Sequence, residues 1–245
     1  MTDALVLRRD PEGLTTLTLN RPDKLNALTP GMFVALRGHL EDLAADTTVG
    51  CVVVEGAGRS FCAGHDLDAI SSGERAPSRH YEPETIDALE ELPQPTIARL
   101  HGHCFTGGLE LALACDFLIA AETTTLGDTH GQWGLAPIWG MSVRLPERVG
   151  RSTAKRLMFT SQRVGGLEAL AIGLVDQCVP DDGLDAAVGD LAGRILANSW
   201  GTNRIDKRLM ADRGGRTRAE ALVHERAMPY GMPEDAAERM RSGGR

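Results

Sequence analysis

Glu110 is the residue whose surroundings most plainly require a chemical explanation. It lies in the segment Thr106–Asp116, TGGLELALACD, where most neighbours are apolar. A carboxylate in such a segment costs free energy unless it is paired or used. Gly107 and Gly108 precede it, and paired glycines let a backbone N–H approach a ligand closely. A second glycine turn, RSFCAGHDL at 59–67, lies upstream. Two such turns, each offering an N–H, favour an oxyanion hole beside an acid or base.

Strands and helices alternate around these turns. Alternating residues in 5–7 and 14–19, with turn residues between them, predict a hairpin. Thr29 and Pro30 predict a helix start, because they are typical of the N-cap and the first helical position. Further strands are expected at 50–55, 96–100 and 117–121, a mobile loop at 71–78, helices at 83–92, 107–115, 151–159, 167–171, 182–197, 199–211 and 216–228, and a break in this helical region at 174–179. Strands joined by helices predict an α/β fold with a parallel sheet.

Length and charge restrict the class of protein. A chain of 245 residues can bury one sizeable core, and its net charge of −8 argues against a nucleic-acid binder, which needs a basic face. Residues 1–13 contain no apolar stretch of signal-peptide length, and no later run approaches a membrane span. The sequence therefore predicts a cytoplasmic protein that binds neither nucleic acid nor a membrane.

The cysteines indicate neither a disulfide framework nor a metal site. There are five, an odd number, and none shows C-x-x-C or His/Cys spacing. A small buried thiol is their ordinary explanation. Cys62 and Cys104 lie nearest the glycine turns, so a nucleophilic role stays open for these two. No metal ligand set is expected.

Several blocks of the chain resemble, in their order, the crotonase family, which is the enoyl-CoA hydratase/isomerase superfamily. They are NRPDKLNAL at 20–28, FCAGHDL at 61–67, PTIARLHG at 95–102, GGLELALACD at 107–116, GLAP at 134–137, RLPERVG at 144–150 and ALAIGLVD at 169–176. One short block recurs by chance, but the ordered set is specific.

The resemblance implies an architecture and an assembly. It implies a crotonase-like spiral of ββα units over 1–185, forming an acyl-CoA-binding catalytic core, and a helical C-terminal trimerisation region over 186–245. A homotrimer or a dimer of trimers is expected. The chain ends in SGGR at 242–245, without the aromatic and basic residues that in the family help to cover the adenine in a neighbouring subunit.

The resemblance also implies roles for the residues at the two turns. Ala63 and Gly107 would supply the N–H groups of the oxyanion hole, and Glu110 matches the first catalytic glutamate of hydratases. The second glutamate falls on His130, which is a departure from the family. An imidazole can act as acid or base near neutral pH, so a His–Glu couple remains possible chemistry, with a merely structural His130 as the alternative. Asp128 is a reserve carboxylate.

CoA is anionic, so an acidic protein must meet it with local cations. The resemblance indicates Arg21 and Lys24, followed by Arg59, while ordinary solvated charges are the alternative reading. The residues that the resemblance places at substrate or CoA are Arg21, Lys24, Ala27, Ala63, Gly64, His65, Asp66, Gly107, Pro137, Ile138 and Trp139. Hydratases commonly have glycine after that proline, so the bulk of Ile138 and Trp139 predicts a different pocket, unless Trp139 only packs against the wall.

These observations favour a hydratase that converts a 2-enoyl-CoA to a 3-hydroxyacyl-CoA without a metal or redox cofactor. Rival reactions of the same oxyanion hole are double-bond isomerisation and C–C bond hydrolysis, since fold similarity alone does not select a reaction. A non-catalytic acyl-CoA-binding protein is the rival from another class.

Overall fold

A mixed six-stranded sheet forms the centre of the molecule. The structure is a computed structural model and describes residues 4–243, with Ile70 described by its backbone alone. Its strand order is β1-β2-β3-β4-β6-β9; β1 is antiparallel to β2 and the other neighbours are parallel. The strands are Val6–Arg9, Leu14–Leu19, Cys51–Gly56, Thr96–Leu100, Phe117–Ala121 and Gln177–Val179. The expected hairpin and parallel sheet are confirmed.

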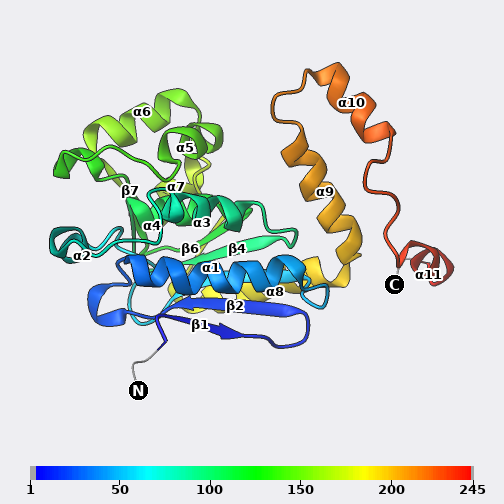
Figure 1. Cartoon of the computed structure of the whole chain (residues 1–245), viewed down its shortest axis with the longest axis horizontal. Helices are drawn as coiled ribbons and strands as arrows, with labels where there is room; N and C mark the ends of the chain where they lie inside the picture. The colour runs from blue at the N-terminus through cyan, green and yellow to red at the C-terminus, as the bar shows by residue number, and fades with distance from the viewer. Residues whose placement is uncertain (1–3, 244–245) are drawn as a thin grey trace.

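Alternation along β3 shows how the sheet divides the core. Val52 and Val54 face one side, where they pack in a cluster with residues of α1, α3 and α4. Cys51 and Val53 face the other side and pack against α8. A parallel strand buried on both faces is apolar throughout, which explains the continuous run in this strand. Figure 1 shows α1 lying along the sheet, with α8 behind it.

A smaller second sheet runs beside the first and creates the repeating unit. It contains β5 (His103–Phe105), β7 (Thr125–Gly127) and β8 (Arg163–Gly165). The chain passes from β4 to β5 and into α4, and then from β6 to β7 and into a short 3₁₀ helix, His130–Trp133. These passages are ββα turns of a spiral. Strands of three residues carry too little alternation to be recognised in the sequence, and none of the three was expected.

The helices of the first part, apart from α2, pack into the core cluster on the α1 side of the sheet. Their bounds are α1 Pro30–Ala45, α2 Leu67–Ser72, α3 Tyr81–Glu90, α4 Gly107–Leu113, α5 Met141–Val149, α6 Arg151–Thr160 and α7 Gly166–Ala171. Helix α1 starts where expected, and the Thr29 hydroxyl accepts the Met32 N–H at 3.2 Å. Helices α2 and α5 were not expected: α2 ends inside the segment interpreted as a loop, and α5 contains Pro146, which argues against a helix in a sequence.

The first C-terminal helix packs in the core, and the later ones form an arm whose first helix still contacts it: Arg204 Nη2 donates to Val49 O at 2.7 Å, and Lys207 Nζ pairs with Asp116 Oδ2 at 2.7 Å. Helix α8 (Leu184–Ala197) buries Val188 and Ile195 against the sheet, so the expected boundary between 185 and 186 falls inside a core element. Helices α9 (Trp200–Asp212), α10 (Arg218–Arg226) and α11 (Ala236–Arg241) form an arm beside the core in Figure 1. The outermost ends of the two expected regions, 1–3 and 244–245, lie outside the described residues. Across 4–243, no helix has the length and apolarity needed to cross a membrane.

Candidate active site

The two glycine turns meet because their flanking segments pair. Phe105 N–H donates to Cys62 O at 3.0 Å, which links the segment after β3 to β5. The start of α4 then passes so near this segment that a Cβ on Gly108 would lie 2.5 Å from Cys62 O. No side chain fits at that distance, so the glycine permits the close approach. The turns that the sequence indicated are therefore neighbours in the fold.

Backbone donors at this junction differ from those expected. Gly107 N–H opens α4 and has no acceptor among residues 4–243. Ala63 N–H, by contrast, donates to Leu25 O at 3.0 Å. His65 N–H has no acceptor in the same part of the chain, and its nitrogen lies 3.4 Å from the position a Cβ on Gly107 would take. In this conformation the N–H groups of Gly107 and His65 are available within residues 4–243, whereas that of Ala63 is bonded.

Glu110 is held at the junction by backbone groups far along the chain. Its side chain is 1% exposed, and Oε1 accepts the N–H groups of Trp139 and Met141, each at 3.0 Å. Oε2 lies 3.7 Å from His130 Nε2. Burial raises the pKa of Glu110, while the Met141 N–H and the charge of His130 act in the opposite direction. The structure thus brings Glu110 and His130 together and leaves one carboxylate oxygen facing the imidazole.

Asp128 orients His130 from behind. Its Oδ1 accepts the His130 ring Nδ1–H at 2.6 Å and the His130 backbone N–H at 3.1 Å. This bond places the second nitrogen, Nε2, toward Glu110. Burial lowers the pKa of His130, but the Asp128 hydrogen bond and the charges of Asp128 and Glu110 outweigh it, so the pKa is raised. Asp128, expected as a reserve carboxylate, is a partner of the histidine in this structure.

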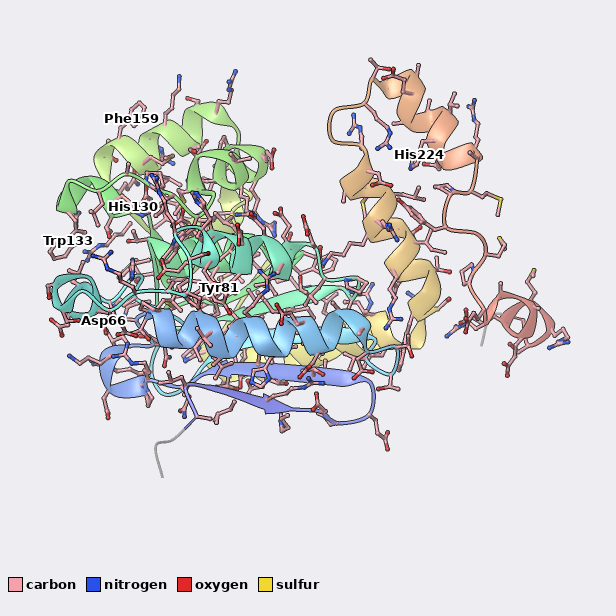
Figure 2. The ribbon with its side chains drawn as sticks, in the orientation of Figure 1. Asp66, Tyr81, His130, Trp133, Phe159 and His224 are labelled. Carbon is pink, nitrogen blue, oxygen red and sulfur yellow. The ribbon has the colours of Figure 1, made fainter. Side chains whose placement is uncertain are left out.

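A cavity of about 300 Å³ opens in front of these groups. It is lined by Ala63, His65, Leu67, Thr106, Gly107, Glu110, Thr129, His130, Trp133, Leu135, Ala136, Ile138 and Trp139. Most of these side chains are apolar, as is usual for a small-molecule pocket with a few convergent polar groups. Figure 2 shows His130, Trp133 and Asp66 at one end of the molecule, remote from His224 on the C-terminal arm.

The two residues after Pro137 line the cavity but differ in solvent exposure. Ile138 is 69% exposed at the rim, whereas Trp139 is 3% exposed. Pro137 is half-buried and does not line the cavity. Burial lowers the pKa of His65, with the charges of Asp66 and Glu74 opposing, and its ring lies 4.9 Å from the Trp139 ring, measured between centroids. Of the two bulky residues expected to alter the pocket, Trp139 is therefore the one that is buried in its wall.

The residues expected at CoA are largely occupied with one another. Arg21 Nη1 donates to Asp66 Oδ2 at 2.8 Å and to Ala27 O at 2.6 Å. Asp66 Oδ1 accepts backbone N–H groups from the first turn of α2. Lys24 pairs with Asp68 at 3.0 Å on the surface. This arrangement braces the loop before the site.

Arg59 and Gly64 complete the expected set. Arg59 is exposed and has no ion pair or hydrogen bond within the described chain, so it remains available to an anion. Gly64 O accepts the Leu28 N–H at 2.8 Å, which ties the glycine turn to the loop that contains Ala27.

Cysteine chemistry has no support at this site. Cys62 and Cys104 are both fully buried, and burial raises the pKa of Cys62 to about 12 and that of Cys104 well above its usual range. A thiol is a nucleophile as the thiolate, so both are structural. Within residues 4–243, no group of three or more His, Cys, Asp or Glu side chains is arranged to hold a metal ion.

Comparison with known proteins assigns the chain to a family. The profile of the enoyl-CoA hydratase/isomerase family matches residues 9–242, and the chain belongs to this family. A relative from Arabidopsis thaliana, named probable enoyl-CoA hydratase 1, peroxisomal, is 32% identical over 96% of this chain and 90% of its own length. The crotonyl-CoA hydratase of Syntrophomonas wolfei is 30% identical over 93% of this chain and 88% of its own length.

A solved structure agrees with the sequence relatives. The enoyl-CoA hydratase of Bacillus anthracis superposes with a TM-score of 0.92 at 30% identity, covering 97% of this chain and 95% of the other. The protein therefore has the crotonase fold, and its relatives support an enzyme of this family.

Proposed function

We propose that this protein is an enoyl-CoA hydratase that adds water to the double bond of a 2-enoyl-CoA. The observation that carries the proposal is that Glu110 Oε2 and His130 Nε2 face each other at a distance of 3.7 Å. Both residues line the same cavity as Gly107. Hydration needs one group to take a proton from water and another to give a proton to C2. Two groups that one water can reach meet this need. The hydratase names of the relatives support the same reaction.

The charges around the pair assign the two roles. Burial opposes the imidazolium of His130, but Asp128 and Glu110 favour it more strongly. The Glu110 carboxylate is the base: it takes a proton from water as the water oxygen bonds to C3. His130 Nε2–H is the acid, and it gives its proton to C2. One water is consumed: the C2–C3 π bond breaks, a C–O bond forms at C3 and a C–H bond forms at C2. The proton taken up by Glu110 then returns to His130, and no electron is transferred, so the proposed reaction needs no redox cofactor and none of its steps calls on a metal.

The proposed oxyanion hole consists of the N–H groups of Gly107 and His65. Negative charge develops on the thioester oxygen as C3 is attacked, and one well-placed donor is worth about 3–4 kcal/mol in such a site. Ala63, for which the family resemblance implied this role, already donates its N–H to Leu25 O. We therefore place His65 in its role and keep Ala63 as part of the cavity wall.

Turnover of crotonyl-CoA tests the proposal directly. The purified protein should consume the enoyl thioester and form a product heavier by one water, detected by mass spectrometry. A product of unchanged mass with a moved double bond would indicate an isomerase instead. Tight binding of acyl-CoA without turnover at any chain length would indicate a non-catalytic binding protein.

One observation favours a second candidate. The Asp128–His130 hydrogen bond of 2.6 Å resembles the pairing of a general base with its orienting carboxylate. Such a base could direct water to a carbonyl carbon, so that hydrolysis would break a C–C bond of a β-diketone. Incubation with a cyclic β-diketone, with the ring-opened acid as the measured product, separates this reaction from hydration.

We also propose that the chain assembles as a homotrimer or as a dimer of trimers. The C-terminal arm exposes large apolar side chains, which closed symmetric association would cover. They include Met210, Val223, Met228, Met232 and Met240. Light scattering at micromolar concentration should give three or six times the chain mass of 26.3 kDa, and a fully active single chain would contradict the proposal.

A further inference from the structure

Trp139 rests its indole directly on the first residue of α4. A Cβ placed on Gly107 would lie 2.3 Å from Trp139 Cζ3 and 2.9 Å from Cε3. The six-membered ring therefore touches the backbone whose N–H is proposed to bind the thioester oxygen. The ring therefore forms the part of the cavity wall that lies against this N–H.

The indole is fixed by its neighbours. The Phe33 ring of α1 meets it edge-on with ring centroids 4.9 Å apart. Its N–H faces Glu82 of α3, although no hydrogen bond of ordinary geometry joins the two. Burial raises the pKa of Glu82, and the interaction with the indole lowers it in part. The Trp139 backbone N–H also donates to Glu110 Oε1 at 3.0 Å. One residue thus holds the candidate base through its backbone and fills the space between α1 and α4 with its side chain.

The size of the cavity gives this packing a consequence. A volume of about 300 Å³ is at the low end for small-molecule sites, which span roughly 300–1,000 Å³. The thioester, the reacting carbons and a water must share it. The rim of the cavity, where the side chains of Leu67 and Ile138 are exposed, is open to solvent and offers the entry for the pantetheine arm. Little room is left for a long acyl tail.

We propose that Trp139 is a specificity-determining residue that ends the acyl pocket and restricts the enzyme to short-chain 2-enoyl thioesters. The inference rests on the proposed hydratase function. An engineered apolar cavity of ~150 Å³ inside a protein is enough for a ligand the size of benzene, and an indole is larger than the side chains whose removal creates such cavities. Trp139→Ala should therefore extend the pocket toward Phe33 while the backbone N–H that holds Glu110 is retained.

Kinetics with crotonyl-, 2-hexenoyl-, 2-octenoyl- and 2-decenoyl-CoA test the inference. The wild-type kcat/KM should fall from crotonyl- to octenoyl-CoA, and Trp139→Ala should raise the octenoyl-to-crotonyl ratio by about tenfold or more. Trp200→Ala is the matched control. It removes another indole, half-buried against Gly13 and Gly50, and should leave the ratio unchanged.

Two further measurements keep the test decisive if Trp139→Ala is poorly folded. Trp139→Leu retains more of the volume and should shift the ratio in the same direction by a smaller factor. Affinities of wild-type protein for saturated butyryl-, hexanoyl-, octanoyl- and decanoyl-CoA need no turnover and should fall beyond the short chains. Equal wild-type use of crotonyl- and decenoyl-CoA, or an unchanged ratio in both variants, would overturn the inference. Length-limited binding without hydration would instead refute the hydratase proposal alone.

Discussion

Two buried carboxylates, each at the start of a helix that follows a glycine turn, have pKa values shifted in opposite directions. Asp66, 7% exposed before α2, is bonded to Arg21 at 2.8 Å as well as to backbone N–H groups. Burial would raise its pKa, but the Arg21 hydrogen bond and charge together with these N–H groups lower it. Glu110, 1% exposed in α4, has two N–H groups but no guanidinium, and burial raises its pKa.

The difference separates a structural carboxylate from one suited to proton transfer. A carboxylate in an ion pair takes up a proton only at low pH, so it is a poor base near neutral pH. A desolvated carboxylate whose nearest charged partner is a histidine can exchange protons in the physiological range. The four predictions below test this contrast, beginning with the largest expected effect.

Glu110→Gln should reduce kcat by about 10³- to 10⁴-fold, in the upper part of the range for a positioned proton-transfer group. The amide keeps the shape of the side chain and can still accept the two N–H groups through its oxygen. Affinity for a saturated acyl-CoA should change by only a few-fold. Steady-state kinetics and calorimetry measure the two quantities, and an unaltered kcat would remove Glu110 from the mechanism.

His130→Gln should reduce kcat by about 10²-fold and remove an ionisation from the pH profile. As a proton donor, His130 is active below its raised pKa and inactive above it, so wild-type kcat/KM should fall as pH rises through that value. The alkaline decline should be absent in the variant. His130→Glu, which restores the carboxylate of the family, should retain or raise hydratase activity. An identical pH profile in His130→Gln and wild type would leave the histidine a structural role.

Asp128→Asn should reduce kcat by roughly 10- to 100-fold, because a hydrogen bond to a charged partner is worth about 1.5–3 kcal/mol. The loss of the carboxylate also lowers the pKa of His130, so the alkaline decline should move to lower pH. This movement distinguishes a residue that orients the acid from one that only supports the fold. A uniform loss of activity at every pH would favour the second role.

Asp66→Asn should lower the free energy of unfolding by about 1–3 kcal/mol, since it weakens a buried pair with Arg21. The pKa of Asp66 is lower in the folded state, so its stabilisation is present above the unfolded pKa and disappears as pH falls through the folded pKa. Urea unfolding at neutral and acidic pH should therefore show a difference between wild type and variant that shrinks at low pH.

Asp68→Asn is the matched control for this measurement. Asp68 lies two residues on and pairs with Lys24 at the surface, where such pairs contribute less than about 1 kcal/mol. Equal destabilisation by the two substitutions would contradict the contrast between the buried and the exposed pair. Asp68→Asn should keep kcat close to that of wild type.

Local patterns in the sequence were enough for the main strands, for most of the longer helices and for one half of the site. The period of apolar residues and the Thr29–Pro30 start signal act within a few residues, so α1 and the main strands could be predicted. Glu110 was recognisable because a lone carboxylate among apolar neighbours needs no tertiary information to look costly. The three-residue strands escaped prediction because two or three side chains cannot establish a period.

What only the tertiary structure decided is which groups meet. Trp139 and Met141 donate to Glu110 across 29 and 31 residues, and Arg21 reaches Asp66 across 45. The same fold pairs Arg21, expected at CoA, with Asp66, and bonds the Ala63 N–H, expected in the oxyanion hole, to Leu25 O. Whether an N–H or a cation is available depends on the partner that the fold brings to it, and no spacing along the chain specifies that partner.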